Sequence, residues 1–441
     1  MGYKEMQREI DLLYKKQCCE RHLQEAIELA ESDDWKSIID NLAKGIYDEK
    51  TDTVTVDKEL YFKTAQQLTD AVLNTFKGFA YDGNQNWLQA EIKATLFQFS
   101  GAKSLAENQA FADLLLDGEG NKRSFAQFRT EVWKTHRLYN EIYLRTEYNT
   151  ALASCQMAAR WSDYIRDGIE WLEYSTVGDN RVRPAHALLD KLVFNINSPV
   201  LNRIYPPNDP GCRCLMKPAD KPVNPISDKE AGALAKKAVT NPVFENNVGK
   251  TGIVFKDDHP YFQSMKGIKE LDAVKNYGMK DIKTIMAKKA DYASPVHIDS
   301  VADYKNWWSD MVKKNGVNET DFVLEDVTGN KVLFDARDGK KANQYFRDHI
   351  LSKPKENRHQ YAANLVDMIT APDELFTKIV KGAREWEYIR YYNNGMYVLT
   401  VAEEEGIIIA KTMYQVDQAN YASGEIAKKR TGVLLHKKTR L

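Results

Sequence analysis

Residues Tyr174–Met216 have the sequence YSTVGDNRVRPAHALLDKLVFNINSPVLNRIYPPNDPGCRCLM. The pattern indicates a turn, a polar cluster, a short apolar core and a second, proline-rich turn that closes on two cysteines. In the first turn, Asp179 can accept hydrogen bonds from Arg181 or from nearby amides. So many arginines beside a histidine and paired cysteines are not typical of a linker, and we expect an ordered structural module. Its polar residues are Asp179, Arg181, Arg183, His186, Cys212, Arg213 and Cys214.

Three of these residues, His186, Cys212 and Cys214, are of the types that hold a structural zinc ion, with Asp179 as a conceivable fourth ligand. Against zinc, ligand cysteines usually have two to four residues between them, whereas Cys212 and Cys214 have one, and only three good ligands are present. The alternative is a compact knot in which Arg213 and the cysteines pack as small groups. We predict this alternative, with no metal and no cofactor. A nucleophilic Cys–His site is less favoured, because no oxyanion-hole signal accompanies the pair.

The chain of 441 residues is 43% hydrophobic and carries a net charge of -1 at pH 7. This balance excludes nucleic-acid binding by bulk charge, so any such activity must be local. Five unevenly spaced cysteines do not form a disulfide framework and suit a reducing cytoplasm. The N-terminal segment lacks the apolar core of a signal peptide, and no apolar run approaches the roughly 18 residues of a membrane span. We therefore expect no membrane association.

Helical periodicity dominates the N-terminal third of the sequence. The longest pattern starts at Ser124 and continues to Tyr164 without proline or glycine, and about forty helical residues would reach roughly 60 Å. On it, Arg145 and Glu147 lie two residues apart, so they face different partners. Earlier helices are expected over 6–30, from Ser32 to a stop at Gly45, over 58–79 and over 86–116.

The motif D-x-R-x-R-x-x-H followed by PP-x-x-P-x-C-R-C, with Arg145 and Glu147 before it, resembles the phage Mu protein F-like family of minor head (head morphogenesis) proteins. The resemblance covers roughly Arg145–Pro218. It implies a role in capsid assembly near the portal, with portal and capsid proteins as partners. It also implies a place in the phage head, after assembly in the host cytoplasm. For Arg145 and Glu147 it implies structural ion pairs that tie the long helix to the arginine-rich turn.

After Cys214 the composition changes, and Pro218, Pro222 and Pro225 indicate a linker. A short helix over 230–239 and a strap anchored by aromatic residues follow. Gly249-Lys250-Thr251 does not form a phosphate loop, because the first glycine of that motif is absent. We therefore expect four segments: a helical N-terminal scaffold over 1–123, a Mu F-like domain over 124–217, a linker and strap over 218–294, and a further domain over 295–441.

The C-terminal segment changes from helices to strands. Its first helix is expected to carry Tyr304, Trp307, Trp308 and Met311 and to end at Asn315-Gly316, and further helices are expected over 343–351 and 357–369. Its strands are expected over 296–298, 322–327, 331–334, 385–392, 396–402, 407–415 and 432–436. Helices before an antiparallel meander make this an α+β domain, in a multi-domain chain that is mainly α before it.

The stretches NRHQYAANLVDMITAPDELF, WEYIRYY, IIIAKTMYQV and KKRTGVLL resemble the barnase/EndoU/colicin/RelE-like nuclease domains of phage proteins and toxins. The resemblance implies a metal-independent endoribonuclease, a hydrolase of toxin type, with RNA or other nucleic acid as ligand and an immunity protein as a further partner. Two alternatives stay open. One is a structural virion protein whose C-terminal domain binds nucleic acid without cleaving it, and the other is a free-standing toxin.

Metal-free RNA cleavage needs a base, a cation for the phosphorane and an acid. His359 has the pKa range for proton transfer, and Thr412 and Tyr414 alternate onto one strand face where they could position the scissile group. Lys411 points the opposite way unless a bulge intervenes. The catalytic candidates are His359, Arg390, Thr412, Tyr414 and Arg430. The candidates for nucleic-acid binding are Lys411, Lys428, Lys429, Tyr421 and His436. A scaffold histidine and a solvated basic edge are the structural alternatives.

Overall fold

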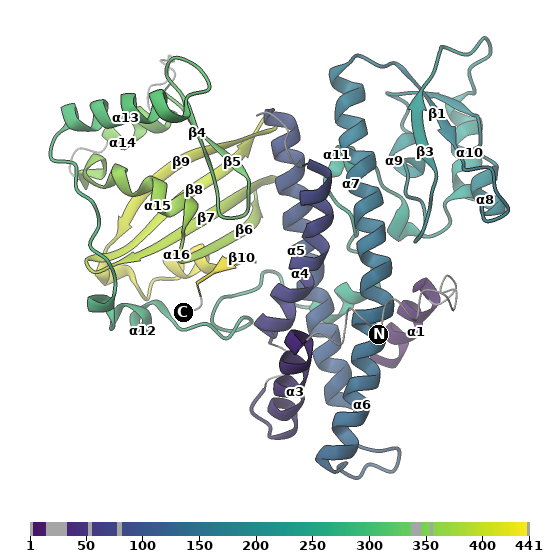
Figure 1. The fold of residues 1–441 in the computed structure, drawn as a ribbon, viewed down its shortest axis with the longest axis horizontal. Coiled ribbons are helices and arrows are strands. Elements are labelled where there is room, and N and C mark those ends of the chain that lie inside the picture. The colour runs from purple at the N-terminus through teal and green to yellow at the C-terminus, as the bar shows by residue number, and fades with distance from the viewer. Residues whose placement is uncertain are drawn as a thin grey trace. The chain divides into compact units, whose positions relative to one another are not determined.

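The computed structural model describes residues 3–14, 33–51, 55–76, 82–336, 345–352 and 356–438 (Figure 1). The chain forms two compact units. The first unit comprises residues 1–79 and 91–268, and the second comprises residues 80–90 and 269–441. The predicted fold class is confirmed: a mainly helical region precedes an α+β region with an antiparallel sheet. The division into four segments stays a prediction. Within the described residues, no helix is both long and apolar enough to cross a bilayer.

Long helices build the first unit, although residues 83–90, at the start of one of them, belong to the second. Their bounds are α1 (Tyr3–Tyr14), α3 (Asp33–Tyr47), α4 (Lys58–Phe76), α5 (Gly83–Asp113), α6 (Phe125–Arg137) and α7 (Leu144–Arg166). Ser124 caps α6 with a capping box to Gln127, where the sequence pattern begins. A π-helical segment, η2 (Leu138–Tyr143), joins α6 to α7, and Figure 1 shows them as one column. The predicted stop at Gly45 is wrong, because α3 runs on to Tyr47. Residues 15–30 and 77–79 of the expected helices lie outside the described residues.

A three-stranded antiparallel sheet in the order β2-β1-β3 holds the arginine- and cysteine-rich stretch. Its strands are β1 (Trp171–Ser175), β2 (Val193–Asn195) and β3 (Leu215–Pro218), and the sequence pattern did not predict them. Short helices lie between its strands and after them in the chain: α8 (Pro184–Ala187), α9 (Leu201–Ile204), α10 (Asp228–Ala238), η3 (Pro242–Phe244), α11 (Val248–Thr251) and η4 (Pro260–Met265). Gly249 in α11 packs on α7, where an added Cβ would lie 2.3 Å from Trp161. This glycine is therefore needed for close packing.

A seven-stranded sheet forms the second unit, in the order β10-β6-β7-β8-β9-β5-β4. All neighbours are antiparallel except the pair β5–β9. The strands are β4 (Phe322–Glu325), β5 (Lys331–Phe334), β6 (Glu374–Val380), β7 (Ala383–Tyr392), β8 (Gly395–Glu404), β9 (Ile407–Val416) and β10 (Val433–Lys437). Glu405 and Gly406, with φ of 53° and 79°, form the two-residue hairpin turn between β8 and β9.

Short helices accompany this sheet: α12 (Ile282–Met286), η5 (Lys289–Asp291), α13 (Val301–Asn315), α14 (Phe346–Leu351), η8 (Arg358–Asn364), α15 (Leu365–Thr370), η9 (Gln418–Asn420), α16 (Gly424–Ala427) and η10 (Lys428–Arg430). Most predicted elements are confirmed, with two corrections. Residues 296–298 form no strand, and the strand β6 was not predicted. Residues 343–344 of an expected helix lie outside the described residues.

Candidate functional site

The second unit contains a cavity of about 880 Å³ beside the C-terminal half of β9. Residues from β9, from η8 and from the segment η9–α16–η10 line it. Its charged and aromatic lining residues are Arg358, Lys429, Glu356, Asp417, Glu425, Tyr361, Tyr414 and Tyr421. The cavity therefore offers two cations and three aromatic rings to a ligand.

Three polar side chains lie in register across the strands next to this cavity. Glu387 on β7 pairs with Thr400 on β8, which pairs with Thr412 on β9. Residues directly opposite in antiparallel strands share one face, and Tyr414, two positions after Thr412, lies on that face too. A register shift makes Lys411 the extra residue between Ala410 and Thr412. This β-bulge is the irregularity that the sequence analysis required for Lys411.

Arg358 extends from η8 toward this face. It donates a 2.7 Å hydrogen bond to Thr412 Oγ1, and its guanidinium carbon lies 5.8 Å from the centre of the Tyr414 ring. The Glu356 carboxylate lies 2.6 Å from the guanidinium and is 45% exposed. Arg358 is thus held by a fixed hydroxyl on one side and by a solvated carboxylate on the other.

Lys429 approaches the same face from η10. Its Nζ lies 2.6 Å from Glu387 Oε1, and the Thr400 hydroxyl donates a 2.8 Å hydrogen bond to Glu387 Oε2. Burial raises the pKa of Glu387 above its ordinary value. Burial alone would lower the pKa of Lys429, but the Glu387 carboxylate outweighs it and raises that pKa. Burial also raises the pKa of Tyr414. Lys429 therefore stays cationic beside the cavity.

His349, on α14, completes the group. Its Nε2 lies 3.0 Å from Thr412 Oγ1 and 3.3 Å from Arg358 Nη1, and its side chain is half-buried. An imidazole held beside a guanidinium and a threonine is a group that can take up or release a proton during a reaction. We call His349, Arg358, Thr412, Lys429 and Glu387 the sheet-face cluster.

The sequence analysis named some of these residues and missed others. Tyr414, Tyr421 and Lys429 line the cavity, and Thr412 bonds to the sheet-face cluster. The residues missed are His349, Arg358, Glu387 and Thr400. Arg358 directly precedes the predicted His359, but successive residues of a 3₁₀-helix point about 120° apart. His349 and His359 are both half-buried, and neither is among the residues that line the cavity, but His349 contacts Thr412 and the cavity residue Arg358.

The other predicted cations lie elsewhere in the second unit. Arg430 is buried and holds Glu374 with two bonds of 2.6 and 2.7 Å. Arg390 lies 3.7 Å from Asp373 and 5.6 Å from the ring centre of Tyr392.

Three further residues predicted to bind nucleic acid also lie outside the cavity lining. Lys411 pairs with Glu404 at 2.6 Å, Lys428 is exposed, and His436 is half-buried on β10.

In the first unit, the motif residues predicted from the sequence form two groups, an ion pair between Asp179 and Arg213 and a cluster of His186 with the two cysteines. Asp179 accepts two hydrogen bonds of 2.7 and 2.8 Å from Arg213. Arg183 donates to the Pro210 carbonyl at 2.8 Å, and Arg181 is exposed. His186, Cys212 and Cys214 form a separate buried cluster, and Asp179 is not part of it.

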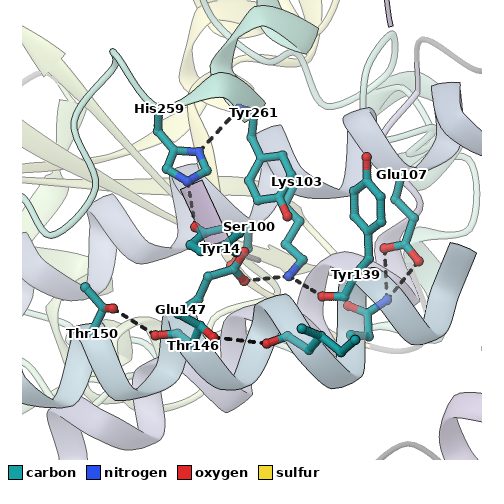
Figure 2. Close-up of polar contacts among 12 residues, drawn as sticks. Tyr14, Ser100, Lys103, Glu107, Tyr139, Thr146, Glu147, Thr150, His259 and Tyr261 are labelled. Carbon is teal, nitrogen blue, oxygen red and sulfur yellow. Dashed lines mark hydrogen bonds and ion pairs between the residues drawn. The ribbon is translucent and has the colours of Figure 1, made fainter. Parts of the chain in front are cut away.

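Glu147 pairs with a lysine of α5 rather than with the arginine-rich turn. Figure 2 shows Lys103 reaching both Glu147, at 2.5 Å, and the backbone oxygen of Tyr139, at 2.8 Å. The ion pair expected between Glu147 and the arginine-rich turn is therefore wrong. The Glu147 side chain is buried between helices, where Lys103 is its partner. Arg145, two residues away, is half-buried.

Residues 108–217 match the Phage Mu protein F like protein family. Residues 310–437 match the family phage-Barnase-EndoU-ColicinE5/D-RelE like nuclease2. Both predicted resemblances are confirmed, and we call these stretches the Mu F-like region and the nuclease-like region. The second includes the whole sheet-face cluster.

Two curated proteins resemble part of the chain. The Mu-like prophage FluMu F protein of Haemophilus influenzae is 34% identical over 76 residues, which is 17% of this chain and 18% of that protein. The Putative capsid assembly protein F of Escherichia phage Mu is 29% identical over 106 residues, which is 24% of this chain and 22% of that protein. The chain thus matches about a fifth of the length of each relative. No solved structure matches the chain.

Proposed function

We propose that this chain is a phage minor head protein that acts in capsid assembly near the portal and carries a metal-independent endoribonuclease. The Mu F-like region supports the first part, since one relative is named as a putative capsid assembly protein. Its partners would be portal and capsid proteins, and it would reside in the virion after assembly in the host cytoplasm. The nuclease-like region supports the second part, with RNA as substrate and an immunity protein as a further partner.

The sheet-face cluster carries the enzymatic proposal. Cleavage by transesterification needs a group that takes the proton of the 2′-hydroxyl, a cation for the phosphorane and an acid for the 5′-oxygen. Arg358 and Lys429 flank the cavity and would hold the phosphate, while His349 would exchange protons beside them. Thr412 bonds to both His349 and Arg358 and would fix their relative orientation.

The aromatic residues of the cavity would hold unpaired bases. Tyr361 and Tyr421 line it, and base–aromatic stacking contributes about 1–3 kcal/mol per base. Stacking of this kind favours single-stranded RNA, whose bases can be splayed out.

The test is incubation of the purified full chain with single-stranded RNA in the presence of a chelator. We expect cleavage products that end in 2′,3′-cyclic phosphates. His349→Ala should lower the cleavage rate by about 10²–10⁴-fold, the range of general acid–base catalysis. His359→Ala, ten positions further along the chain, is the matched control and should cleave at the wild-type rate.

Two outcomes would change the proposal. If His359→Ala loses activity and His349→Ala does not, the residue first predicted from the sequence takes the proton-transfer role. If the folded wild-type chain binds RNA but leaves a broad panel of RNAs intact, the C-terminal region is a nucleic-acid-binding part of a structural virion protein.

A further inference from the structure

A histidine and two cysteines converge in the Mu F-like region although 26 and 28 residues separate them in the chain. His186 Nδ1 lies 3.7 Å from Cys212 Sγ and 3.8 Å from Cys214 Sγ, and the three ligand atoms all lie within 4.8 Å of one another. The three side chains are buried, and both cysteines are free thiols. The fold thus brings two sulfur atoms and one imidazole nitrogen close enough together to contact a single metal ion.

The two nitrogen–sulfur separations fit a tetrahedral metal site. Zinc bonds of about 2.3 Å to sulfur and about 2.0–2.1 Å to nitrogen place the two donor atoms about 3.6 Å apart at a tetrahedral angle. The observed separations of 3.7 and 3.8 Å are close to this value. Thiolate and imidazole donors in tetrahedral geometry select zinc over the harder cations, which prefer oxygen.

The second nitrogen of the histidine has the partner expected of a metal ligand. His186 Nε2 lies 3.2 Å from Asp209 Oδ2, and the same oxygen lies 3.4 Å from Arg183 Nε. A histidine that binds metal through one nitrogen usually donates its other N–H to a carboxylate, which fixes the tautomer and the ring orientation. Nε2 makes no hydrogen bond in this geometry, and Asp209 is the carboxylate placed to accept one from it after a small rotation of the ring, while Nδ1 faces the two sulfur atoms.

A small cavity provides the fourth position. It measures about 20 Å³ and is lined by all three donors together with Arg181 and Arg183. A cavity needs about 10–15 Å³ to hold one water molecule, so this one has room for a single water beside the donors.

We propose that His186, Cys212 and Cys214 bind one Zn²⁺ ion, with a water molecule as the fourth ligand and Asp209 as the orienting carboxylate. The ion would join α8 to the loop that enters β3. The three strands of this sheet have five, three and four residues. Because so small a sheet buries little apolar surface, metal binding would supply part of its folding free energy. This proposal is independent of the proposed nuclease activity.

The experiment uses the full chain, produced without a histidine tag in zinc-containing medium and analysed by elemental mass spectrometry after gel filtration. We expect about one zinc ion per chain, since one set of three ligands and a water completes a single site. Cys212→Ala and Cys214→Ala should carry close to none. Cys155→Ala is the matched control: it also removes a buried free cysteine of the first unit but leaves the site intact, so its zinc content should equal that of the wild type.

A second measurement decides the question even if the cysteine variants fail to fold. The wild-type chain, stripped of metal and loaded with Co²⁺, should show the near-ultraviolet thiolate-to-cobalt absorption and the visible bands of a tetrahedral site. Asp209→Asn should keep the stoichiometry but bind zinc about 10–100-fold more weakly. A folded wild-type chain with no zinc and no cobalt–thiolate absorption would overturn the proposal, as would a Cys212–Cys214 disulfide in the freshly purified protein.

Discussion

Two lysine–glutamate pairs, one in each unit, have nearly the same geometry and different surroundings. Lys103 lies 2.5 Å from Glu147 in the first unit, and Lys429 lies 2.6 Å from Glu387 in the second. The side chains of Lys103 and Glu147 are 1% and 0% exposed, whereas Lys429 keeps 24% of its side chain exposed at the cavity. The distance within an ion pair therefore does not reveal its role. Access to solvent distinguishes a pair that can meet a ligand from one that holds helices together.

The pKa shifts of the two pairs also follow their access to solvent. Burial raises the pKa of Glu147 and lowers the pKa of Lys103, so the sealed surroundings oppose charge on both groups. The pKa of Lys429 is instead raised, because the attraction of Glu387 outweighs its partial burial. Lys429 can thus present a stable positive charge to phosphate, and Lys103 cannot reach one.

The largest expected effect comes from breaking the sealed pair. Lys103→Met leaves the Glu147 carboxylate buried without its cation, and such changes cost about 3–5 kcal/mol. The measurement is hydrogen exchange of peptides from α5 and α7, which reports the free energy of opening these helices. Lys134→Met is the control, because Lys134 lies 2.7 Å from Glu131 in an exposed pair worth about 1 kcal/mol or less. Equal losses in the two variants would contradict the structural role of the sealed pair.

The next largest effect distinguishes the arginine proposed to be catalytic from a structural arginine in the second unit. Arg358 lies at the cavity, and Arg430 is enclosed with Glu374, whose side chain is 0% exposed. Arg358→Met should lower RNA cleavage by about 10²–10³-fold, the cost of losing one donor to a developing charge, and should leave hydrogen exchange of β6 unchanged. Arg430→Met should instead raise exchange in β6, because it leaves the buried Glu374 carboxylate with the Tyr391 hydroxyl but without its cation.

The opposite result for Arg430 would restore the prediction made from the sequence. If Arg430→Met lowers cleavage and flattens the salt dependence of RNA binding while β6 exchanges as in the wild type, Arg430 contacts phosphate. In that case the cavity beside Arg358 is not where the RNA backbone binds.

Local sequence patterns explain which elements of the fold were predictable. The long helix from Ser124 follows an apolar pattern of 3.6 residues, and β7 to β9 are ten-residue runs rich in β-branched and aromatic residues, with short turns between them. β6 was missed because its seven residues, ELFTKIV, directly follow Pro372 and Asp373, which are typical of a turn. The strands of the three-stranded sheet have five residues or fewer and carry too short a pattern to recognise.

The candidate sites were predictable only where one element carries them. Thr412 and Tyr414 share a strand, so alternation alone placed them on one face. His349 and Arg358 come from separate short helices, and tertiary packing brings them to Thr412. In the same way, His186 meets the two cysteines only through the fold of the intervening loop. The spacing of residues along the sequence does not predict contacts between residues that are far apart in the chain.

Low pH should lower the stability of the first unit through His259, which lies beside the Lys103–Glu147 pair (Figure 2). Its Nε2 lies 2.6 Å from the Tyr14 hydroxyl, and its Nδ1 accepts from the backbone N–H of Tyr261 (Figure 2). Burial, with a further contribution from Lys103, lowers the pKa of His259 from 6.5 to about 3. The unfolded chain therefore binds a proton first as the pH falls. Stability of the first unit should drop by about 1.4 kcal/mol for each pH unit between roughly 6.5 and 3.

The measurement for His259 is the thermal midpoint of the full chain at several pH values from 7 to 5. His259→Gln removes the titrating group, so its midpoint should fall less steeply with acid than that of the wild type. Parallel curves for the two proteins would show that His259 does not titrate in this range. Exposed His297 provides the control, and His297→Gln should follow the wild-type curve.

The smallest expected effect concerns Glu356, a carboxylate that lines the cavity of the second unit. Glu356 lies 2.6 Å from Arg358 and is 45% exposed, so it occupies the guanidinium that we assign to the RNA phosphate. Glu356→Gln removes this competing charge. An exposed pair contributes about 1 kcal/mol or less, so RNA should bind up to about fivefold more tightly. Glu404→Gln is the matched control, because Glu404 is 55% exposed and pairs at 2.6 Å with Lys411, which is not among the residues lining the cavity. Affinities from fluorescence anisotropy at fixed salt would distinguish the two variants. An equal gain in both would mean that RNA responds only to net charge, and a loss in Glu356→Gln alone would mean that Glu356 positions Arg358 instead of competing for it.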